Sequence, residues 1–337
     1  MRDRNGRAFR PRRRTVLSGL AGALSLPLVR PTAAAGTGYV FVSSEGGNAV
    51  IVYEDRTFDT VAVIATSRQP RAMILNAERS RLYVTCGEDD VVEIVDLASL
   101  AVIDRVPTAG SPEMIALSSD EAFLFVSTED ASLLQKIDLA TKRAVRQVPT
   151  GAEPEGVAIG RDGAFVYVTS EIADMVHVVD ADGGVVVDNV VVGTRPRRLA
   201  ETPDGAELWV TNELSGDVSI VDLAARATVG TIAFRPPGQR QSEVTPVGIA
   251  MTADGRTAAV ALGYANAIAF VDVAARAVTG YVMVGRRPWG LAFSADERMV
   301  YVANALSDDL SIIDMRAQRN IRSVATGRVP HTVVVDV

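Results

Sequence analysis

Cysteine and histidine are scarce in this chain of 337 residues, which holds one cysteine and two histidines. The single thiol, Cys86, cannot close an intramolecular disulfide, and its place at the end of an apolar segment favours packing over reactivity. The two imidazoles, His177 and His331, leave almost no room for transition-metal sites built from two or three histidines. An acid–base enzyme would have to use one histidine or carboxylates.

The chain also lacks the short motifs that mark common catalytic sites. It has no Gly-x-Ser-x-Gly elbow, no phosphate-binding glycine loop, no His-Glu-x-x-His and no Cys-x-x-Cys-His haem attachment. No motif therefore supports an enzyme. Chemistry carried by residues dispersed along the chain stays open.

Basic residues are few once the first 35 positions are set aside. Those positions hold eight Arg and one Asp, so the other 302 residues hold 26 of the 34 basic and 40 of the 41 acidic side chains, a net charge of −14. An acidic surface is repelled by phosphate backbones and anionic lipids, which argues against nucleic-acid or membrane-surface binding as the main function.

Residues 1–35 have the pattern of an export signal. Seven arginines precede an apolar run over residues 16–29, and Ala33-Ala34-Ala35 offers the small residues of a cleavage site, so Gly36 is the predicted mature N-terminus. The pair Arg13-Arg14 resembles the twin-arginine export motif. We expect a periplasmic protein; the alternative is an uncleaved anchor. No later segment is long and apolar enough to span a membrane.

A repeat of 42 residues organises residues 36–337. Seven prolines share this spacing, with one step of 50: Pro70, Pro112, Pro154, Pro196, Pro246, Pro288 and Pro330. An acidic column keeps the same spacing: Glu54, Asp96, Asp138, Asp180, Asp222, Asp272 and Asp314. A third column is aromatic in six of seven units: Phe41, Tyr83, Phe125, Tyr167, Trp209, Ala259 and Tyr301.

Each repeat contains four short β-branched segments separated by turn residues, for example 156–160, 165–170, 176–180 and 185–192. Periods of 40–45 residues with four strands are typical of β-propellers. The sequence therefore predicts an all-β, seven-bladed β-propeller with four antiparallel strands per blade, forming one domain over residues 36–337. We expect residues 331–337 to supply the innermost strand of the blade that begins at Tyr39, which closes the ring. The one departure from the period, residues 235–242, is either a functional loop or a passive one.

Several units carry a recognisable signature: Tyr83-Val84-Thr85-Cys86, Tyr167-Val168-Thr169-Ser170, Trp209-Val210-Thr211-Asn212 and Tyr301-Val302-Ala303-Asn304. These resemble the signature of the YVTN family of β-propeller repeats. Other segments, such as Glu153-Pro154-Glu155-Gly156 and Arg195-Pro196-Arg197, look closest to the propeller proteins associated with PQQ-dependent alcohol catabolism. This resemblance implies partners such as a periplasmic quinoprotein dehydrogenase or an ABC transporter component. It implies no settled activity.

The residue after each proline begins an inner strand, where propeller ligands usually bind. This column is unusually varied: Arg71, Glu113, Glu155, Arg197, Val247, Trp289 and His331. We predict that all of these except Val247 line a common ligand-binding funnel. We also expect that replacing Glu113 and Glu155 by Ala abolishes binding and leaves the melting temperature nearly unchanged. The alternative is a solvated rim of compensating charge.

A second column offers carboxylates at Glu45, Glu129, Glu171 and Glu213. If they converge, they could hold a hard cation such as Ca²⁺ or a lanthanide, although residues on a circle can lie too far apart. No cofactor is required by any motif. His177 falls mid-strand, where a structural hydrogen bond inside the core is expected.

Three functions follow. The first is a non-catalytic binding or accessory protein linked to periplasmic PQQ-dependent alcohol oxidation. The second is a metal-dependent lactonase or lyase that uses funnel carboxylates. The third is single-stranded DNA binding with Trp289 as a stacking platform, which needs one basic groove formed by Arg71, Arg195, Arg197, Arg198, Arg286 and Arg287.

Overall fold

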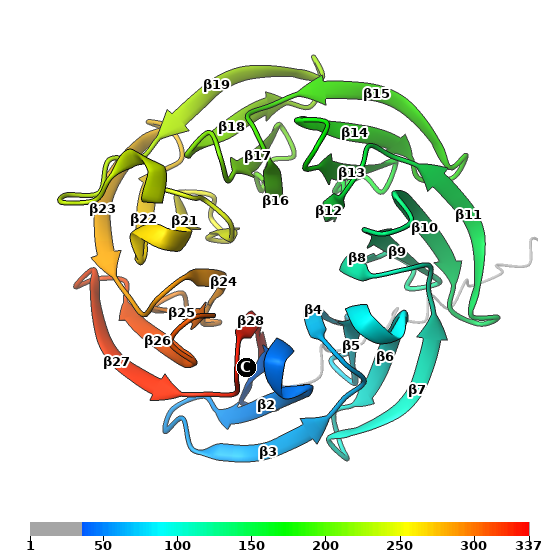
Figure 1. Cartoon of the computed structure of the whole chain (residues 1–337), viewed down its shortest axis with the longest axis horizontal. Coiled ribbons are helices and arrows are strands. Elements are labelled where there is room, and N and C mark those ends of the chain that lie inside the picture. The colour runs from blue at the N-terminus through cyan, green and yellow to red at the C-terminus, as the bar shows by residue number, and fades with distance from the viewer. Residues whose placement is uncertain (1–35, 337) are drawn as a thin grey trace, which may run out of the picture. The chain divides into compact units, whose positions relative to one another are not determined.

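The computed structural model of the chain describes residues 36–336, and the predicted export signal lies outside them. Within this range, 28 strands form seven four-stranded sheets. Figure 1 shows the sheets as the blades of a ring, with the outer strands along its rim. The predicted seven-bladed β-propeller is confirmed.

Blade 1 joins the two ends of this range. It consists of β28 (Pro330–Asp336), β1 (Tyr39–Ser44), β2 (Ala49–Glu54) and β3 (Thr60–Ala65). The last strand pairs antiparallel with β1, Tyr39 opposite Asp336 and Val42 opposite Val333. The ring closes as predicted.

The other blades each take four consecutive strands, written from the inside outward. Blade 2 is β4 (Pro70–Leu75), β5 (Arg81–Cys86), β6 (Val91–Asp96) and β7 (Ala101–Pro107); blade 3 is β8 (Pro112–Leu117), β9 (Phe123–Thr128), β10 (Leu133–Asp138) and β11 (Arg143–Pro149); blade 4 is β12 (Pro154–Ile159), β13 (Phe165–Ser170), β14 (Met175–Asp180) and β15 (Val185–Val191). Blade 5 is β16 (Pro196–Glu201), β17 (Glu207–Asn212), β18 (Asp217–Asp222) and β19 (Ala227–Ala233); blade 6 is β20 (Ile249–Met251), β21 (Thr257–Ala261), β22 (Ala267–Asp272) and β23 (Ala277–Met283); blade 7 is β24 (Pro288–Phe293), β25 (Met299–Asn304), β26 (Asp309–Asp314) and β27 (Arg319–Ala325).

The acidic column ends the third strand of each blade and caps the turn that follows. Asp138 Oδ1 accepts the backbone N–H of Thr141 at 2.7 Å, and Asp222 Oδ1 accepts that of Ala225 at 2.7 Å. An aspartate that bonds to its own backbone two or three residues on stabilises a tight turn. The repeat keeps this residue because it fixes the outer hairpin.

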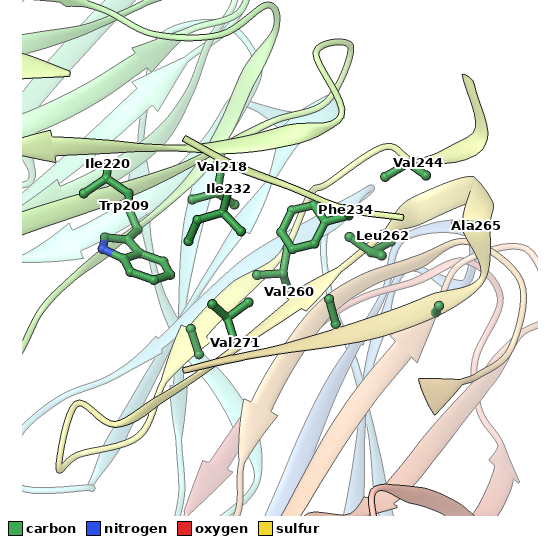
Figure 2. Close-up of a cluster of buried hydrophobic side chains, with 13 residues drawn as sticks. Trp209, Val218, Ile220, Ile232, Phe234, Val244, Val260, Leu262, Ala265 and Val271 are labelled. Carbon is green, nitrogen blue, oxygen red and sulfur yellow. The ribbon is translucent and has the colours of Figure 1, made fainter. Parts of the chain in front are cut away.

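Side chains packed between neighbouring blades form the hydrophobic core. Between blades 5 and 6, fully buried Trp209 and Phe234 pack with Val260 and Val271 (Figure 2). The aromatic column is therefore a packing column. Tyr83, Phe125 and Tyr167 occupy the equivalent positions in their blades and are also buried.

Residues 235–242 lie between β19 and β20 and lead into the short 3-10 helix η3 (Gln241–Glu243). The backbone N–H of Arg235 donates to the Tyr281 hydroxyl at 2.7 Å, which ties the loop to blade 6. Three other 3-10 helices, η1 (Glu45–Gly47), η2 (Gly87–Asp89) and η4 (Gly263–Ala265), follow the second strand of a blade. Across residues 36–336 no helix has the length and apolarity needed to cross a membrane.

Candidate functional site

The inner strands of every blade except blade 6 begin with the same irregularity, which sets the position of the predicted site residues. In blade 4, Pro154 pairs with Ser170 and Val157 with Val168, so two residues bulge out of register between them. Blades 2, 3, 5 and 7 show the same shift after their prolines. A bulge re-aims the side chains next to it. The residue that follows the proline lies within this bulge, so the bulge sets the direction of its side chain.

Hydroxyl groups on the second strands fill these bulges and link each blade to the next. The Thr169 hydroxyl accepts the N–H of Gly156 at 2.7 Å and donates to the backbone carbonyl of Arg197 in blade 5 at 2.9 Å. The same donation to the following blade is made by Ser43 to Arg71, Thr85 to Glu113, Ser127 to Glu155 and Thr211 to Val247. In five residues of the column that follows the proline, the backbone carbonyl is thus fixed by a hydroxyl group of the preceding blade.

In blades 6 and 7, a glycine allows the backbone of the next inner strand to approach closely. A Cβ at Gly248 would lie 2.1 Å from the Trp289 carbonyl oxygen, and one at Gly290 would lie 2.3 Å from that of His331. Ala261 and Ala303 occupy the hydroxyl column in these two blades. Close backbone contact therefore positions Trp289 and His331 where no hydroxyl is available.

Arg71 contacts carboxylates that belong to blades 1 and 3. Its guanidinium pairs with Glu113, which is 2% exposed, and lies 3.4 Å from Glu45 Oε1 and 3.6 Å from Glu129 Oε2. Two glutamates of the second column therefore neutralise an arginine of the first.

Arg197 and Arg198 of blade 5 form the second ionic group. Arg197 pairs with Glu171 and lies 3.7 Å from Glu155 Oε1, while Arg198 Nη1 lies 2.7 Å from the same Glu155 oxygen. Burial opposes ionisation of Glu155, but the neighbouring Arg197 and Arg198 outweigh it and lower the pKa of this carboxyl. Glu155 is therefore a charged partner of two arginines.

Glu213 extends this group toward blade 7. Its carboxylate lies 3.3 Å from Arg195 Nε, 3.6 Å from Arg197 Nε and 2.6 Å from Arg287 Nη2. All three arginines therefore share one buried carboxylate.

Two guanidinium groups lie close to the Trp289 ring. The Cζ atoms of Arg197 and Arg287 are 4.9 and 4.6 Å from its ring centroid, close enough for cation–π attraction. The His331 ring is also close to Trp289, and the two ring centroids are 5.4 Å apart. The indole Nε1–H is buried and has no hydrogen-bond partner among the described residues. A buried donor without an acceptor is costly in a folded protein, so it marks a place where a ligand oxygen would be favoured.

His331 is held as a neutral imidazole. Burial, together with Arg198, Arg71 and Arg197, brings its pKa well below the ordinary histidine value. Its Nδ1 lies 3.0 Å from the Thr332 hydroxyl, and its Nε2 lies 3.4 Å from Nη2 of Arg198, which reaches across from blade 5. An arginine can only donate, so Nε2 faces it as an acceptor.

Arg198 also borders a small cavity of about 130 Å³, which inner strands of five further blades line through Met114, Gly156, Gly248, Gly290 and Thr332. Burial lowers the pKa of this guanidinium to about 10, against the opposing attraction of Glu155. A larger groove of about 660 Å³ lies between blades 7 and 1 and includes Phe58, Asp296 and Tyr301. That groove contains none of the predicted site residues.

The structure brings the six predicted residues into one group, which we call the axial cluster: Arg71, Glu113, Glu155, Arg197, Trp289 and His331. Arg195, Arg198 and Arg287 also belong to it; the sequence placed them in the DNA-binding alternative and not in the predicted ligand-binding set. Arg198 could have been noticed, because the same repeat position is Ala72, Met114, Gly156, Gly248, Gly290 or Thr332 in the other blades.

Two expectations change with this geometry. The carboxylates of Glu113 and Glu155 are 2% and 4% exposed and are paired with arginine, so they are not an open, solvated lining. Their removal would take away the one carboxylate paired with buried Arg198 among the described residues and weaken the compensation of Arg71 and Arg197, and we no longer expect it to spare stability. The four glutamates proposed as cation ligands contact arginines instead, and within residues 36–336 no three His, Cys, Asp or Glu side chains converge as a metal-ligand group.

His177 has the structural role expected of it. The Gly151 N–H donates to His177 Nε2 at 2.8 Å, and His177 Nδ1 lies 2.5 Å from the Asn189 side-chain oxygen. Burial lowers its pKa. Cys86 is also buried, and burial raises the pKa of its thiol.

Two protein-family models match parts of this chain. A YNCE-like β-propeller model matches residues 25–164, and a model of 7-bladed β-propeller lactonases matches residues 185–337. Each covers less than half of the chain. No curated protein matches.

Solved structures are similar over most of the chain. Hydrazine synthase from Kuenenia stuttgartiensis is 21% identical, with a TM-score of 0.76 over 82% of this chain and 92% of that one. A proposed 6-phosphogluconolactonase from Bacteroides fragilis is 16% identical, with a TM-score of 0.73 over 88% and 97%. One from Bacteroides uniformis is 14% identical, with a TM-score of 0.72 over 88% and 98%. At these identities the likeness concerns the fold: the chain is a seven-bladed β-propeller that is similar to YNCE-like and lactonase propellers.

Proposed function

We propose that the axial cluster binds a small polyhydroxylated carboxylic acid or its lactone. The observation that carries this proposal is the Trp289 indole, flanked by Arg197 and Arg287, with a buried N–H that lacks an acceptor. An aromatic ring packs against the C–H groups of a sugar-like ring, while its N–H bonds to an oxygen. Guanidinium groups recognise carboxylates through two parallel hydrogen bonds.

The ionic partners of the cluster favour binding over catalysis. Glu155 has a lowered pKa and two arginine partners, so it holds no proton to donate near neutral pH. Glu171 and Glu213 are likewise engaged with arginines. Such carboxylates can accept hydrogen bonds from ligand hydroxyls without leaving their positions.

Lactone hydrolysis is the second candidate, because a lactonase model matches residues 185–337 and two similar structures are proposed 6-phosphogluconolactonases. In this reaction water adds to the lactone carbonyl and the ring C–O bond breaks. Neutral His331 is the one described imidazole near the cluster and is the natural base for the attacking water. Its Nε2 would first have to leave Arg198.

Calorimetric titration with gluconate, 6-phosphogluconate and δ-gluconolactone tests both candidates. We expect saturable binding that weakens about tenfold in Trp289→Phe, which keeps the ring and loses the N–H, and more in Trp289→Ala. Arg298→Ala, at an exposed turn outside the cluster, is the matched control. Turnover of the lactone above the solvent rate, lost in His331→Gln, would favour the lactonase. No binding of any of the three compounds would contradict the proposal.

The remaining expectations rest on sequence alone. Export to the periplasm is tested by fractionating cells that express the full chain, with the double variant Arg13→Lys and Arg14→Lys as the protein that should stay in the cytoplasm.

A link to quinoprotein alcohol oxidation is tested by co-purification of a dehydrogenase or transporter component from alcohol-grown cells.

A further inference from the structure

Four neighbouring blades expose a large apolar side chain at one repeat position. Ile172 of blade 4, Leu214 of blade 5, Tyr264 of blade 6 and Leu306 of blade 7 are 65%, 65%, 53% and 51% exposed. Each lies in the turn that joins the second strand of its blade to the third. We call these four residues the apolar arc. A single exposed apolar residue is ordinary, but the recurrence of one at the same repeat position in four neighbouring blades needs an explanation.

The turn itself does not require an apolar residue. The same repeat position is Gly46 in blade 1, Glu88 in blade 2 and Asp130 in blade 3. The backbone of the turn is nevertheless conserved in geometry: the Leu214 N–H donates to the Thr194 carbonyl at 3.1 Å and the Leu306 N–H to the Arg286 carbonyl at 3.0 Å. The Gly46 N–H of blade 1 makes the equivalent bond to the Arg328 carbonyl at 3.1 Å, so this bond does not require an apolar side chain.

Unpaired arginines accompany the arc. Arg235, Arg240, Arg286 and Arg328 are exposed in the loops that enter blades 6, 7 and 1. Within residues 36–336 none of these four forms an ion pair with a carboxylate. Arg286 instead donates to the Leu306 carbonyl at 2.7 Å, which holds its side chain beside the arc.

The other half of the ring is arranged differently. Arg68 of blade 2 is paired with Glu88 at 3.2 Å and with Asp89 at 2.6 Å. Acidic residues thus neutralise the arginine there. Near the arc, exposed Asp308 accepts the backbone N–H of Val329 at 2.8 Å and is used within its own loop.

The eight-residue insertion borders the arc. A Cβ at Gly216, two residues after Leu214, would lie 2.8 Å from the Gln241 side chain of η3, so the insertion packs against the turn of blade 5. Helix η3 also contacts η4, which carries Tyr264. The one departure from the repeat therefore packs against the turns that carry Leu214 and Tyr264, and the Arg235 side chain donates to Gln241 of the same insertion.

We propose that the apolar arc and its arginines bind a partner protein that presents an apolar patch fringed with Asp and Glu. Charge complementarity favours this partner, since Arg235, Arg240 and Arg286 in the loops that enter blades 6 and 7 have no carboxylate partner among the described residues, whereas Arg68 of blade 2 is neutralised by Glu88 and Asp89. A second copy of the chain, arc to arc, would oppose arginine to arginine. An anionic bilayer would be flat and would also meet Glu88, Asp89 and Asp130 on the other half of the ring.

The arc is adjacent to the axial cluster, because Ile172 and Leu214 directly follow Glu171 and Glu213. A partner seated on the arc would therefore lie over part of that cluster. The inference does not depend on the ligand proposed above, since its residues and its test are separate.

Photocrosslinking of the full chain in its native cells tests this surface. A benzophenone amino acid is placed at Ile172, Leu214 or Leu306, and at Asp130 as the matched control position in blade 3. We expect the same protein to crosslink from all three arc positions and not from Asp130. Equal crosslinking from Asp130, or the absence of any protein adduct, would overturn the proposal.

The identified protein is then purified and its affinity for the chain is measured. We expect the double variant Leu214→Ser with Leu306→Ser to weaken binding at least tenfold. We expect Arg286→Glu to weaken binding as well, and its affinity should fall less with added salt than the affinity of the wild type does. Melting temperatures should stay unchanged because these side chains are exposed. Binding unaffected by either variant, or chain recovered instead on phosphatidylglycerol vesicles or a single-stranded oligonucleotide, would overturn the proposal.

Discussion

Thr169 and Arg197 are joined across a blade boundary: the Thr169 hydroxyl donates to the Arg197 backbone carbonyl at 2.9 Å. The same oxygen accepts the N–H of Gly156 at 2.7 Å. One hydroxyl thus satisfies two buried backbone groups that the bulge leaves unpaired. It also fixes the backbone from which a side chain of the axial cluster projects.

Replacing Thr169 with Val should destabilise the protein by about 1–3 kcal/mol, because the shape is kept while two buried backbone groups lose their partner. Urea unfolding followed by tryptophan fluorescence measures the change. Thr169→Ser is the control, since it keeps the hydroxyl and loses only a methyl group. Equal stability of the Val and Ser variants would show that the hydroxyl bond contributes nothing.

Removing the Glu155 carboxylate should cost far more than removing an exposed one. Glu155 is 4% exposed and pairs with Arg197 and Arg198, so Glu155→Ala leaves two buried guanidinium groups with less compensation. A broken buried pair typically costs about 3–5 kcal/mol. Denaturant unfolding of Glu155→Ala, and of Glu155→Gln as the variant of similar shape, measures this loss.

The matched control is Arg256→Ala, whose side chain is 86% exposed and lies 3.7 Å from Asp254. Exposed pairs contribute at most about 1 kcal/mol. If Glu155→Ala unfolds at the same denaturant concentration as the control, the carboxylate is not needed to compensate the arginines.

The Cys86 thiol should be unreactive in the folded protein. It is fully buried, and burial raises its pKa, so the nucleophilic thiolate is scarce. We expect a chromogenic disulfide reagent at pH 8 to modify one thiol in denaturant and none in buffer over the same time. Rapid labelling of the native chain would contradict the burial.

The ring could be predicted from sequence because its determinants repeat. Proline before the inner strand, aspartate at the outer turn and an aromatic residue between blades each recur at one spacing, and each performs one local task. The closure by β28 followed from the complementary ends of the pattern. Repetition makes local rules visible many times over.

The axial cluster could be predicted only in part. The position after the proline identified six members, but ion pairing between blades depends on how far each side chain reaches across the axis. Arg198 contacts Glu155 of blade 4 and His331 of blade 1, and no spacing in the sequence reveals this reach. The glutamates chosen as cation ligands failed to converge for the same reason: each meets an arginine first.

Stability should fall as the pH drops below the ordinary histidine pKa. His331 and His177 both have lowered pKa values in the folded protein, mainly through burial. Below about pH 6.5 the unfolded chain therefore binds protons that the folded chain does not, and this favours unfolding. Each histidine can contribute a loss of up to about 1.4 kcal/mol per pH unit until its folded pKa is reached. The lowered pKa of Glu155 adds a separate loss, which begins only below its ordinary value near 4.5.

Urea unfolding at pH 7.5 and pH 5.5 separates these contributions, because both values lie above the pH at which the Glu155 contribution begins to be lost. We expect the wild type to lose stability between the two, His331→Gln and His177→Gln each to lose less, and the double variant to lose least. The quantity compared is the difference between the free energies of unfolding at the two pH values. A variant that is less stable at both pH values therefore still shows how much its histidine contributes to the pH dependence. His331 should supply the larger share, since Arg198, Arg71 and Arg197 add their repulsion to its burial, whereas the Asn189 oxygen partly favours the charged form of His177. A pH response that survives in the double variant would mean that other groups carry it.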